Sequence, residues 1–298
     1  MQTPSPRHKP LLAALFAVLL WAFAFPASKA ALPYLPAEQI VLLRYLVACA
    51  FYFALFALGR FPLPRLRDLP ALLVLGVLGV TVYQLLFVQG VGRVAAGAAA
   101  MIIAANPVFV GLLAWMFLRE RLGAGAWCGI SASIAGVALI TLGKGAAGEL
   151  AGYLMLLAAV FSISIYFVFQ KPFFARYSPL AMTSYTSAAG TLPLLFLLPQ
   201  SIEAALAALA APPSALWSIA AMGVFSSGIG FLLWFYALSK LPAGIVASSL
   251  FLQPLFVTAM AWVWLQELPS ARAFAGGAVI LFGVALILLP RKSRSAPE

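Results

Sequence analysis

Residues 96–122 read AGAAAMIIAANPVFVGLLAWMFLRERL, and residues 243–269 read AGIVASSLFLQPLFVTAMAWVWLQELP. The two stretches begin with the same Ala-Gly pair and carry Pro, Trp and Glu in the same register. Pro107 therefore matches Pro254 at an offset of 147 residues. Each stretch contains an apolar run long enough to cross a bilayer as a helix, because about 20 residues at about 1.5 Å per residue span the hydrocarbon core. The chain thus contains a repeat built from membrane helices.

The composition of the whole chain has the same character. Of its 298 residues, 64% are hydrophobic and 8% are charged, whereas soluble domains are about 45–50% apolar and about 25% charged. A soluble fold of this length needs a charged surface that this sequence does not supply. The net charge of +11 comes mainly from short loops between apolar runs, so it does not indicate a nucleic-acid surface. The composition excludes a soluble enzyme, a disordered chain and a nucleic-acid-binding module.

Ten apolar runs follow one another along the chain. They are continuous rather than alternating, so they predict helices and not the strands of a barrel. The first run follows basic residues, as a signal peptide would, but it is longer than the about 7–15 residues of a signal-peptide core. We interpret it as a retained helix. The runs lie at about 11–31, 37–58, 69–91, 94–118, 123–143, 149–171, 179–199, 214–238, 242–264 and 270–290.

The repeat divides the ten runs into two halves of five. An offset near 142 also aligns Lys29 with Lys171 in the first helix of each half. Because five is an odd number, the second half must enter the membrane from the opposite face. Inverted repeats of this kind are typical of transporters, which bind substrate near the membrane midplane between the halves. The predicted units are a cytoplasmic tail at 1–10, a first repeat at 11–143, a second repeat at 149–290 and a cytoplasmic tail at 291–298.

The fold class that follows is an all-α integral membrane protein with ten transmembrane helices in two inverted five-helix repeats.

Positive charges predict its orientation, because cytoplasmic loops of membrane proteins carry the excess of lysine and arginine. With the N-terminus in the cytoplasm, 13 of these residues fall on the inner side and 3 on the outer side, while Lys29 and Arg44 lie inside helices. We therefore expect both termini in the cytoplasm.

The chain offers few residues for catalysis. Its single histidine, His8, lies in the predicted tail, so neither a serine–histidine pair within the membrane nor an HExxH zinc motif can form. Cys49 and Cys128 lie inside apolar runs, where small core residues are usual. All seven acids lie at or near the ends of the runs. We expect no enzyme activity, no catalytic residue, no metal and no cofactor, and transport by uniport or exchange without a proton-carrying carboxylate in the membrane.

Two prolines stand in the middle of predicted helices. Pro107 and Pro254 each remove a helical hydrogen bond, which frees the carbonyls of Ile103 and Leu250. The residues before them carry side-chain amides, and we include Asn106 and Gln253 among the candidate substrate-binding residues. We interpret the prolines as hinges that open polar backbone toward a cavity; the alternative is a kink satisfied by neighbouring helices.

Aromatic residues alternate with small ones on the faces of several predicted helices. In the third helix, Tyr83 and Phe87 share a face with glycines at steps of three or four residues, and Trp234 has a similar setting in the eighth. Such a face can line a cavity with room for a ligand; the alternative is close helix packing. The further candidates of this kind for substrate binding are Trp21, Phe25, Ser162 and Tyr166.

Charged residues near the helices complete the candidate site. Arg44 lies well inside its run, where charge is costly and often functional, so it is a candidate for binding a substrate carboxylate. Lys29 lies at the end of its helix and can reach outward. Glu120 and Glu267 end the fourth and ninth helices at opposite faces, and we expect each to act as a gate or as a helix cap.

Glycines in the fifth and tenth helices have small-xxx-small spacing. Gly125, Gly129 and Ser133 show it in the fifth helix, and Gly276 and Gly283 show a looser form in the tenth. This spacing allows close helix contact, either within one chain or across a dimer seam. We expect packing within a monomer, with a dimer as the alternative.

These features resemble the drug/metabolite transporter superfamily, EamA type. The resembling residues are Arg44, Asn106-Pro107 with the Leu118–Leu122 ending, and their repeat Gln253-Pro254 with Leu265-Gln266-Glu267. The resemblance covers residues 11–290, and within the family the chain looks most like the YddG-type aromatic amino acid exporters. It departs from a full repeat at Arg44, because Thr186 and Ser187 stand in the corresponding region of the second half.

The resemblance implies a transporter of the bacterial cell inner membrane that exports small metabolites, above all neutral or aromatic amino acids, by alternating access. Its expected partners are a small-molecule substrate and the lipid bilayer, without nucleic acid. The alternatives are a carrier of phosphorylated metabolites or nucleotide sugars, which needs several cations in the cavity, and a lipid flippase or channel, which needs a continuous polar stripe.

Overall fold

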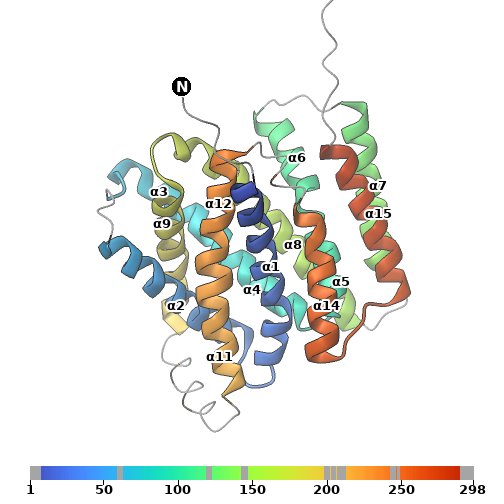
Figure 1. Ribbon diagram of the computed structural model, residues 1–298, viewed down its shortest axis with the longest axis horizontal. Helices are drawn as coiled ribbons and strands as arrows, with labels where there is room; N and C mark the ends of the chain where they lie inside the picture. Colours follow the sequence, from blue (N-terminus) through green and yellow to red (C-terminus); the bar gives the residue numbers. More distant parts are fainter. Residues whose placement is uncertain are drawn as a thin grey trace, which may run out of the picture.

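The computed structural model describes residues 8–58, 63–118, 123–141, 147–197, 213–241 and 249–288, together with the single positions 202, 206 and 246. All regular elements within these residues are helices. They form one bundle, in which α1 (His8–Ala31) begins and α15 (Ala271–Leu288) ends at the same end of the molecule (Figure 1). An even number of crossings returns the chain to the side from which it started. His8, which the sequence places in the tail, is the first residue of α1.

The first half of the chain supplies five crossings. The third is a column of four segments, and the fourth is broken into two helices. In chain order they are α1; α2 (Ala37–Leu58); η1 (Leu66–Asp68) with α3 (Leu69–Gly76), η2 (Val77–Val82) and α4 (Tyr83–Val91); α5 (Ala96–Ile103) with α6 (Asn106–Leu118); and α7 (Ala124–Thr141).

The second half repeats this plan. Its second crossing is shorter than the predicted run 179–199, because a new 3-10 turn begins at Pro193, which cannot donate a helical hydrogen bond. In chain order the crossings are α8 (Ala147–Gln170) with η3 (Lys171–Ala175); α9 (Pro179–Thr191) with η4 (Pro193–Leu197); α11 (Ser214–Ala221) with η5 (Met222–Gly230) and α12 (Phe231–Lys240); η6 (Ser249–Leu252) with α14 (Gln253–Leu265); and α15.

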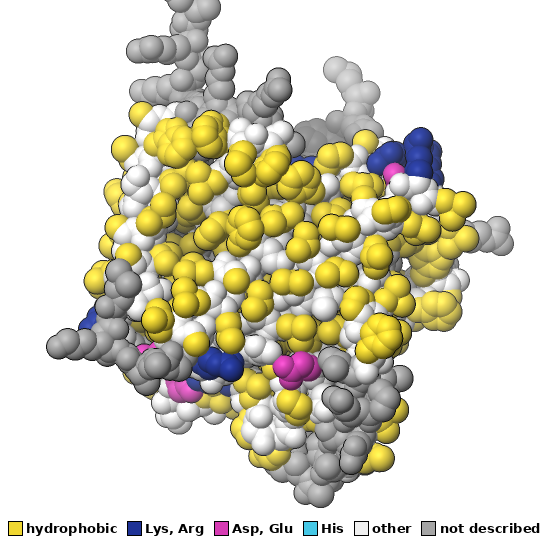
Figure 2. Space-filling view, turned by 180° about the vertical axis from the view of Figure 1, so that it is seen from behind, with side chains coloured by type: hydrophobic (Ala, Val, Ile, Leu, Met, Phe, Trp, Pro, Cys, Tyr) yellow, Lys and Arg dark blue, Asp and Glu magenta, His cyan; other side chains and the backbone are white. Residues whose placement is uncertain are grey.

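The helices have the length and surface of a membrane protein. Seven of the described helical stretches are long and apolar enough to cross a membrane, and Gln253–Leu265 and Ala271–Ile287 are shorter apolar helices. Hydrophobic side chains cover the middle of the molecule, while the charged side chains in view gather near its two ends (Figure 2). This distribution fits a bundle surrounded by hydrocarbon. The all-α membrane fold with two five-helix repeats is therefore confirmed.

The contact between α7 and α15 displays the inversion of the repeats. Gly129 packs against the backbone of Gly283, and Gly136 packs against that of Gly276. As α7 advances from Gly129 to Gly136, α15 recedes from Gly283 to Gly276, so the two helices run antiparallel. They are also copies of each other, because Gly129 and Gly276 are 147 residues apart. Repeat-related helices that run in opposite directions are what an inverted repeat requires.

The glycines of this seam leave no room for a side chain. A Cβ atom on Gly136 would lie 2.6 Å from the carbonyl oxygen of Gly276, and one on Gly276 would lie 2.7 Å from the oxygen of Gly136. The small-xxx-small spacing of the sequence is thus used at these four glycines inside one chain, where it lets two backbones touch.

Both halves contain a widened, π-helical segment in their third crossing, η2 in the first half and η5 in the second. The two segments overlap at the offset of 147. A π-helical turn shifts the helical hydrogen bonds by one residue and often marks a functional site. Side chains from neighbouring helices donate to carbonyls of these segments: Ser162 Oγ to Leu78 O at 2.8 Å and Tyr52 OH to Ser227 O at 2.5 Å.

We predict that Gly136→Ala destabilises the protein, because the new Cβ would collide with the backbone of α15. Overpacking of a buried contact costs about 1–3 kcal/mol. Gly125→Ala in the same helix is the matched control, since nothing lies within 4 Å of its Cβ position. Thermal unfolding of the purified protein in detergent measures both. Equal stability of the two variants would contradict the close packing of Gly136 against α15.

Candidate functional site

A cavity lies between the two halves of the bundle. Four crossings of the first half and three of the second reach it, and most of its lining is apolar or aromatic. The lining residues are Trp21, Ala24 and Phe25 of α1; Arg44 of α2; Tyr83, Gln84 and Phe87 of α4; Ile103, Ala104 and Asn106 at the α5–α6 junction; Ile163 and Phe167 of α8; Phe231 of α12; and Leu250 and Gln253 at the η6–α14 junction.

The lining follows the internal repeat. At the offset of 147, Ile103 pairs with Leu250, and Asn106 pairs with Gln253. Gln84 pairs in the same way with Phe231. At the offset of 142, two further pairs of lining residues appear. They are Trp21 with Ile163, and Phe25 with Phe167. Ten of the lining residues are therefore five repeat-related pairs, and the cavity lies where the two halves face each other.

Two broken helices contribute to the lining. Helix α5 ends at Ile103, a turn follows, and α6 begins at Asn106. In the second half, α14 begins at Gln253 after the 3-10 turn η6. The sequence predicts continuous helices kinked in the middle; instead, each proline stands in the first turn of a new helix, where its missing N–H and fixed φ are tolerated.

At the breaks, two residues of the cavity lining lose a helical hydrogen-bond donor. Pro107 cannot donate to the carbonyl of Ile103, and Pro254 cannot donate to that of Leu250. Both carbonyl-bearing residues line the cavity. The Asn106 side chain is held by a hydrogen bond from its Nδ2 to Ser164 Oγ at 2.9 Å. Irregular backbone at membrane depth is tolerated where it lines a cavity.

Arg44 brings a positive charge to the cavity. Its side chain is buried, with 2% of the residue exposed. Nε donates to Ser227 Oγ at 2.8 Å, and Nη1 donates to Gln84 Oε1 at 3.1 Å. Gln84 is itself fixed, since its Nε2 donates to Tyr45 OH at 3.0 Å. The ion pairs among the described residues are Lys29–Glu267 and Arg176–Asp68, and neither includes Arg44.

Aromatic rings form much of the rest of the lining. The centroid of the Trp21 ring is 5.1 Å from that of Phe231, and the Phe25 centroid is 4.9 Å from that of Phe87. Tyr83 continues the group, with its centroid 5.9 Å from Phe87. Contacts at these separations fix the rings against one another. The cavity therefore has an aromatic wall and one fixed cation.

Three of the predicted binding residues lie outside the lining. Trp234 is buried behind Trp21, with 5.0 Å between the ring centroids. Ser162 is engaged with η2, as described above. Tyr166 shares a hydrogen bond of 3.1 Å with Thr186 and lies against Gly79, whose Cβ position is 2.7 Å from the Tyr166 ring. The predicted residues that do line the cavity are Trp21, Phe25, Arg44, Tyr83, Phe87, Asn106 and Gln253.

Several lining residues were not predicted from the sequence. Gln84, Phe167 and Phe231 are the main ones. The repeat itself carried the signal: Phe167 corresponds to Phe25, and Phe231 corresponds to Gln84. Mapping the candidate Phe25 through its offset would have found Phe167, whereas Gln84 and Phe231 correspond only to each other and neither was a candidate.

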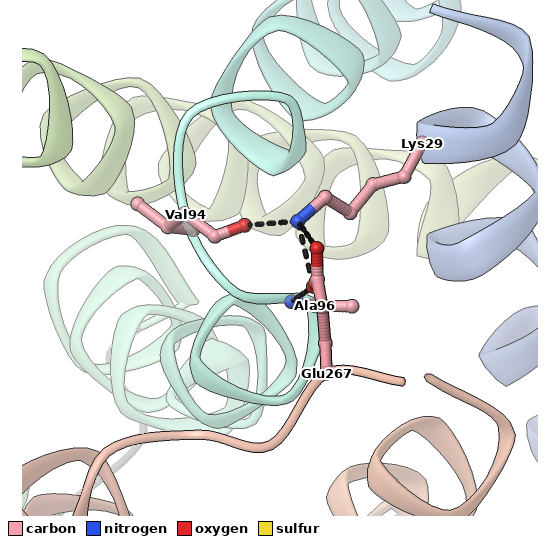
Figure 3. A network of polar contacts seen from close by, with 4 residues as sticks. All are labelled: Lys29, Val94, Ala96 and Glu267. Carbon is pink, nitrogen blue, oxygen red and sulfur yellow. Dashed lines mark hydrogen bonds and ion pairs between the residues drawn. The ribbon is translucent and has the colours of Figure 1, made fainter. Parts of the chain in front are cut away.

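A charged network links the two halves near one end of the bundle (Figure 3). Lys29 Nζ lies 2.5 Å and 2.7 Å from the two carboxylate oxygens of Glu267 and donates to Val94 O at 3.0 Å. Glu267 also accepts a bond of 3.3 Å from the N–H of Ala96, the first residue of α5. The network thus joins the end of α1 and the start of α5, in the first half, to the α14–α15 link of the second.

Glu267 reaches this position because α14 ends in a left-handed residue, Gln266, with φ 54°. The turn directs the carboxylate back toward the first half. Glu267 therefore caps α5, while the following helix α15 is capped by Ser270, whose Oγ accepts from Ala273 N. Glu120, the repeat counterpart of Glu267, lies outside the described residues.

The repeat counterpart of Lys29 has a different setting. Lys171 follows α8, which crosses in the opposite direction to α1, so Lys171 lies at the other end of the bundle. It is exposed and forms no hydrogen bond or ion pair with another described residue. The two ends of the bundle therefore differ in their charged contacts.

Within the described ranges, no three His, Cys, Asp or Glu residues come together in a group that could hold a metal ion. The acids of the described residues also stand apart from the cavity lining. The described lining offers aromatic rings, side-chain amides and one guanidinium.

Comparison with known proteins gives matches along nearly the whole chain. The model of the EamA-like transporter family matches residues 8–142 and 150–289. A probable terminal-alkyne amino-acid exporter of Streptantibioticus cattleyicolor is 36% identical over 94% of this chain and 93% of its own length. The uncharacterized transporter YdfC of Bacillus subtilis is 33% identical over 91% of this chain and 88% of its own.

A solved crystal structure has the same fold. It superposes with a TM-score of 0.63 over 97% of this chain and 99% of its own length, at 20% sequence identity.

We predict that cysteines placed in the cavity lining react with a water-soluble thiol reagent. The background is a Cys49→Ala/Cys128→Ala protein in detergent, because both native cysteines are free thiols. Gln253→Cys and Phe167→Cys should be labelled at least about tenfold faster than Tyr166→Cys and Trp234→Cys, which are buried outside the lining. Mass spectrometry measures the rates, and similar rates at all four positions would refute the cavity.

Proposed function

Since this chain belongs to the EamA-like transporter family, we propose that it exports small amphipathic metabolites, above all neutral or aromatic amino acids, by alternating access. The observation that carries the proposal is the cavity between inverted repeats, lined by repeat-related residues from both halves. In such folds, the two halves exchange conformations around a fixed site, and each face is open in turn. The protein is a multi-pass membrane transporter, and its proposed site is the bacterial inner membrane with both termini in the cytoplasm.

The lining supports an amphipathic substrate. Trp21, Phe25 and Phe87 offer aromatic surface, while Asn106 and Gln253 offer amide groups at the helix breaks. Ligand sites are typically mostly apolar, with a few placed polar groups that orient the ligand. The relative from Streptantibioticus cattleyicolor, which is named a probable terminal-alkyne amino-acid exporter, supports the same class.

The alternatives have less support. A phosphorylated metabolite or nucleotide sugar calls for several cations, and Arg44 is the one cation that the described cavity lining contains. A channel or flippase calls for a continuous polar path, and the described lining is largely apolar and aromatic. The cavity in the described residues also contains no acid, which supports uniport or exchange rather than proton coupling.

The proposed moving parts are the broken helices and the charged network. Pro107 and Pro254 stand at breaks where few backbone hydrogen bonds resist bending, and we assign the hinges to them. The Lys29–Glu267 pair is the proposed gate, because it ties the two halves together at one end of the bundle. Lys171, the repeat counterpart of Lys29 at the other end, is exposed and has no such ion pair among the described residues, which supports a state in which only the Lys29 end is latched. The proposed working unit is a monomer.

Transport in proteoliposomes tests the function. We predict counterflow of radiolabelled phenylalanine or leucine, and a rate reduced at least about tenfold by Tyr83→Ala, since one buried aromatic contact is worth about 1–3 kcal/mol. The control is Trp217→Ala, because Trp217 is 69% exposed on the outside of the bundle. An imposed pH gradient should not drive accumulation above equilibrium. Absence of counterflow for every amino acid would overturn the proposed function.

A double-mutant cycle tests the gate. Glu267→Gln and Lys29→Met should each increase labelling of Gln253→Cys by an impermeant thiol reagent added from the Lys29 end, because each breaks the same latch. The double variant should label no faster than either single variant. Lys171→Met is the matched control and should not increase labelling from that end. Additive effects, or an equal effect of Lys171→Met, would show that the pair is not a gate.

A further inference from the structure

The charge of Arg44 is not neutralised by the protein around it. The acceptors of its described hydrogen bonds, the Ser227 hydroxyl and the Gln84 amide oxygen, are both uncharged. Within the described part of the chain, no carboxylate lies within ion-pair distance of the guanidinium. Ionisable groups inside a membrane protein are costly and are usually paired or face a water-filled path. A buried, fixed and unneutralised guanidinium at the edge of a cavity points to a counterion that arrives with the ligand.

The guanidinium is held ready for such a ligand. Gln84 Nε2 donates to Tyr45 OH, which directs the amide oxygen of Gln84 toward Arg44. Ser227 belongs to the π-helical segment η5, and its carbonyl is fixed by the hydroxyl of Tyr52. An arginine has five N–H donors, and these two bonds use two of them. The remaining donors form the planar fork that binds a carboxylate in a bidentate manner.

The repeat counterpart of Arg44 in the second half is uncharged. At the offset of 142, the counterpart of Arg44 is Thr186. The Thr186 hydroxyl is engaged with Tyr166 and with the carbonyl of Met182, at 3.1 Å and 2.9 Å. The described cavity can therefore fix one negative charge, on the side of α2, and a ligand bound there has a defined orientation.

The helix break offers the complementary charge partner. The C-terminal end of a helix carries partial negative charge, and α5 ends at the cavity with Ile103 and Ala104 in its lining. The carbonyl of Ile103 receives no hydrogen bond from Pro107. Carbonyls and C-terminal ends of broken membrane helices bind cations in other transport sites. The partial negative charge of this helix end suits an ammonium group.

We propose that the cavity recognises its substrate as a zwitterionic monocarboxylate, with the carboxylate on Arg44, the ammonium at the C-terminal end of α5 and the apolar side chain against Trp21 and Phe25. This inference rests on the proposed function and narrows it to α-amino acids with uncharged side chains. It excludes amines, because they lack the carboxylate. It also excludes dianionic phosphates, because one guanidinium does not neutralise two negative charges.

Competition binding to the purified wild-type protein tests the inference without any substitution. The probe is radiolabelled L-phenylalanine, and the competitors are phenylalanine itself, phenylalaninamide, 2-phenylethylamine and 3-phenylpropionate. The amide and the amine lack the carboxylate and should compete at concentrations about 10- to 100-fold higher, the factor expected for loss of a hydrogen bond to a charged group. 3-Phenylpropionate lacks the ammonium and should fall between. Equal competition by phenylalaninamide and phenylalanine would overturn the carboxylate anchor.

Substitutions then locate the anchor. Arg44→Lys, which keeps the charge but not the fork, should weaken phenylalanine binding about tenfold, and Arg44→Gln should also abolish the preference for the acid over the amide. Thr186→Ala is the matched control in the other half and should retain that preference. Preference for the acid that persists in Arg44→Gln would overturn the assignment to Arg44. Counterflow of wild-type protein with an amide as readily as with the acid would overturn the anchor while leaving the proposed function standing.

Discussion

Hydrocarbon offers no hydrogen-bond partner to a peptide group, and this constraint governs where the bundle departs from regular helix. The departures that bear on the site are the two π-helical segments and the two breaks before Pro107 and Pro254. Carbonyls released by η2 and η5 accept bonds from Ser162 and Tyr52, so neighbouring helices satisfy them. The residues whose carbonyls lose a proline donor at the breaks, Ile103 and Leu250, belong to the cavity lining instead. The breaks therefore place irregular backbone in the lining of the cavity.

Much of this architecture could be predicted from the sequence, because apolar run length and the register of Pro107 with Pro254 report directly on membrane helices and their repetition. The site was less predictable. Helical spacing shows which residues share a face, but not which neighbour that face meets. Trp234 and Tyr166 lie on faces like those of Tyr83 and Phe87, yet they pack against Trp21 and Gly79. The missed residue Phe167 could be found through the repeat, whereas the pairing of Lys29 with Glu267 depends on tertiary packing.

The two charged sites show how one scaffold handles charge in two settings. Lys29 and Glu267 lie at the end of the bundle, partly exposed, and neutralise each other across the halves. Arg44 lies inside, with neutral partners on all described sides. Two partly exposed charges that neutralise each other, as Lys29 and Glu267 do, suit a contact that forms and breaks, since water can hydrate both charges when the pair separates. A buried charge without an opposite charge beside it, as at Arg44, suits a site that binds and releases a charged ligand.

The seam between α7 and α15 also has a consequence for the order in which the molecule can be built. Gly129 and Gly136 are synthesised well before their partners Gly283 and Gly276, which belong to the last described helix of the chain. Until that helix has been inserted, the groove along α7 has only lipid to fill it. The first repeat therefore cannot complete its own packing during translation. Its contact with the second repeat forms only once α15 is present, and a chain truncated before α15 leaves these glycines of α7 without their partner.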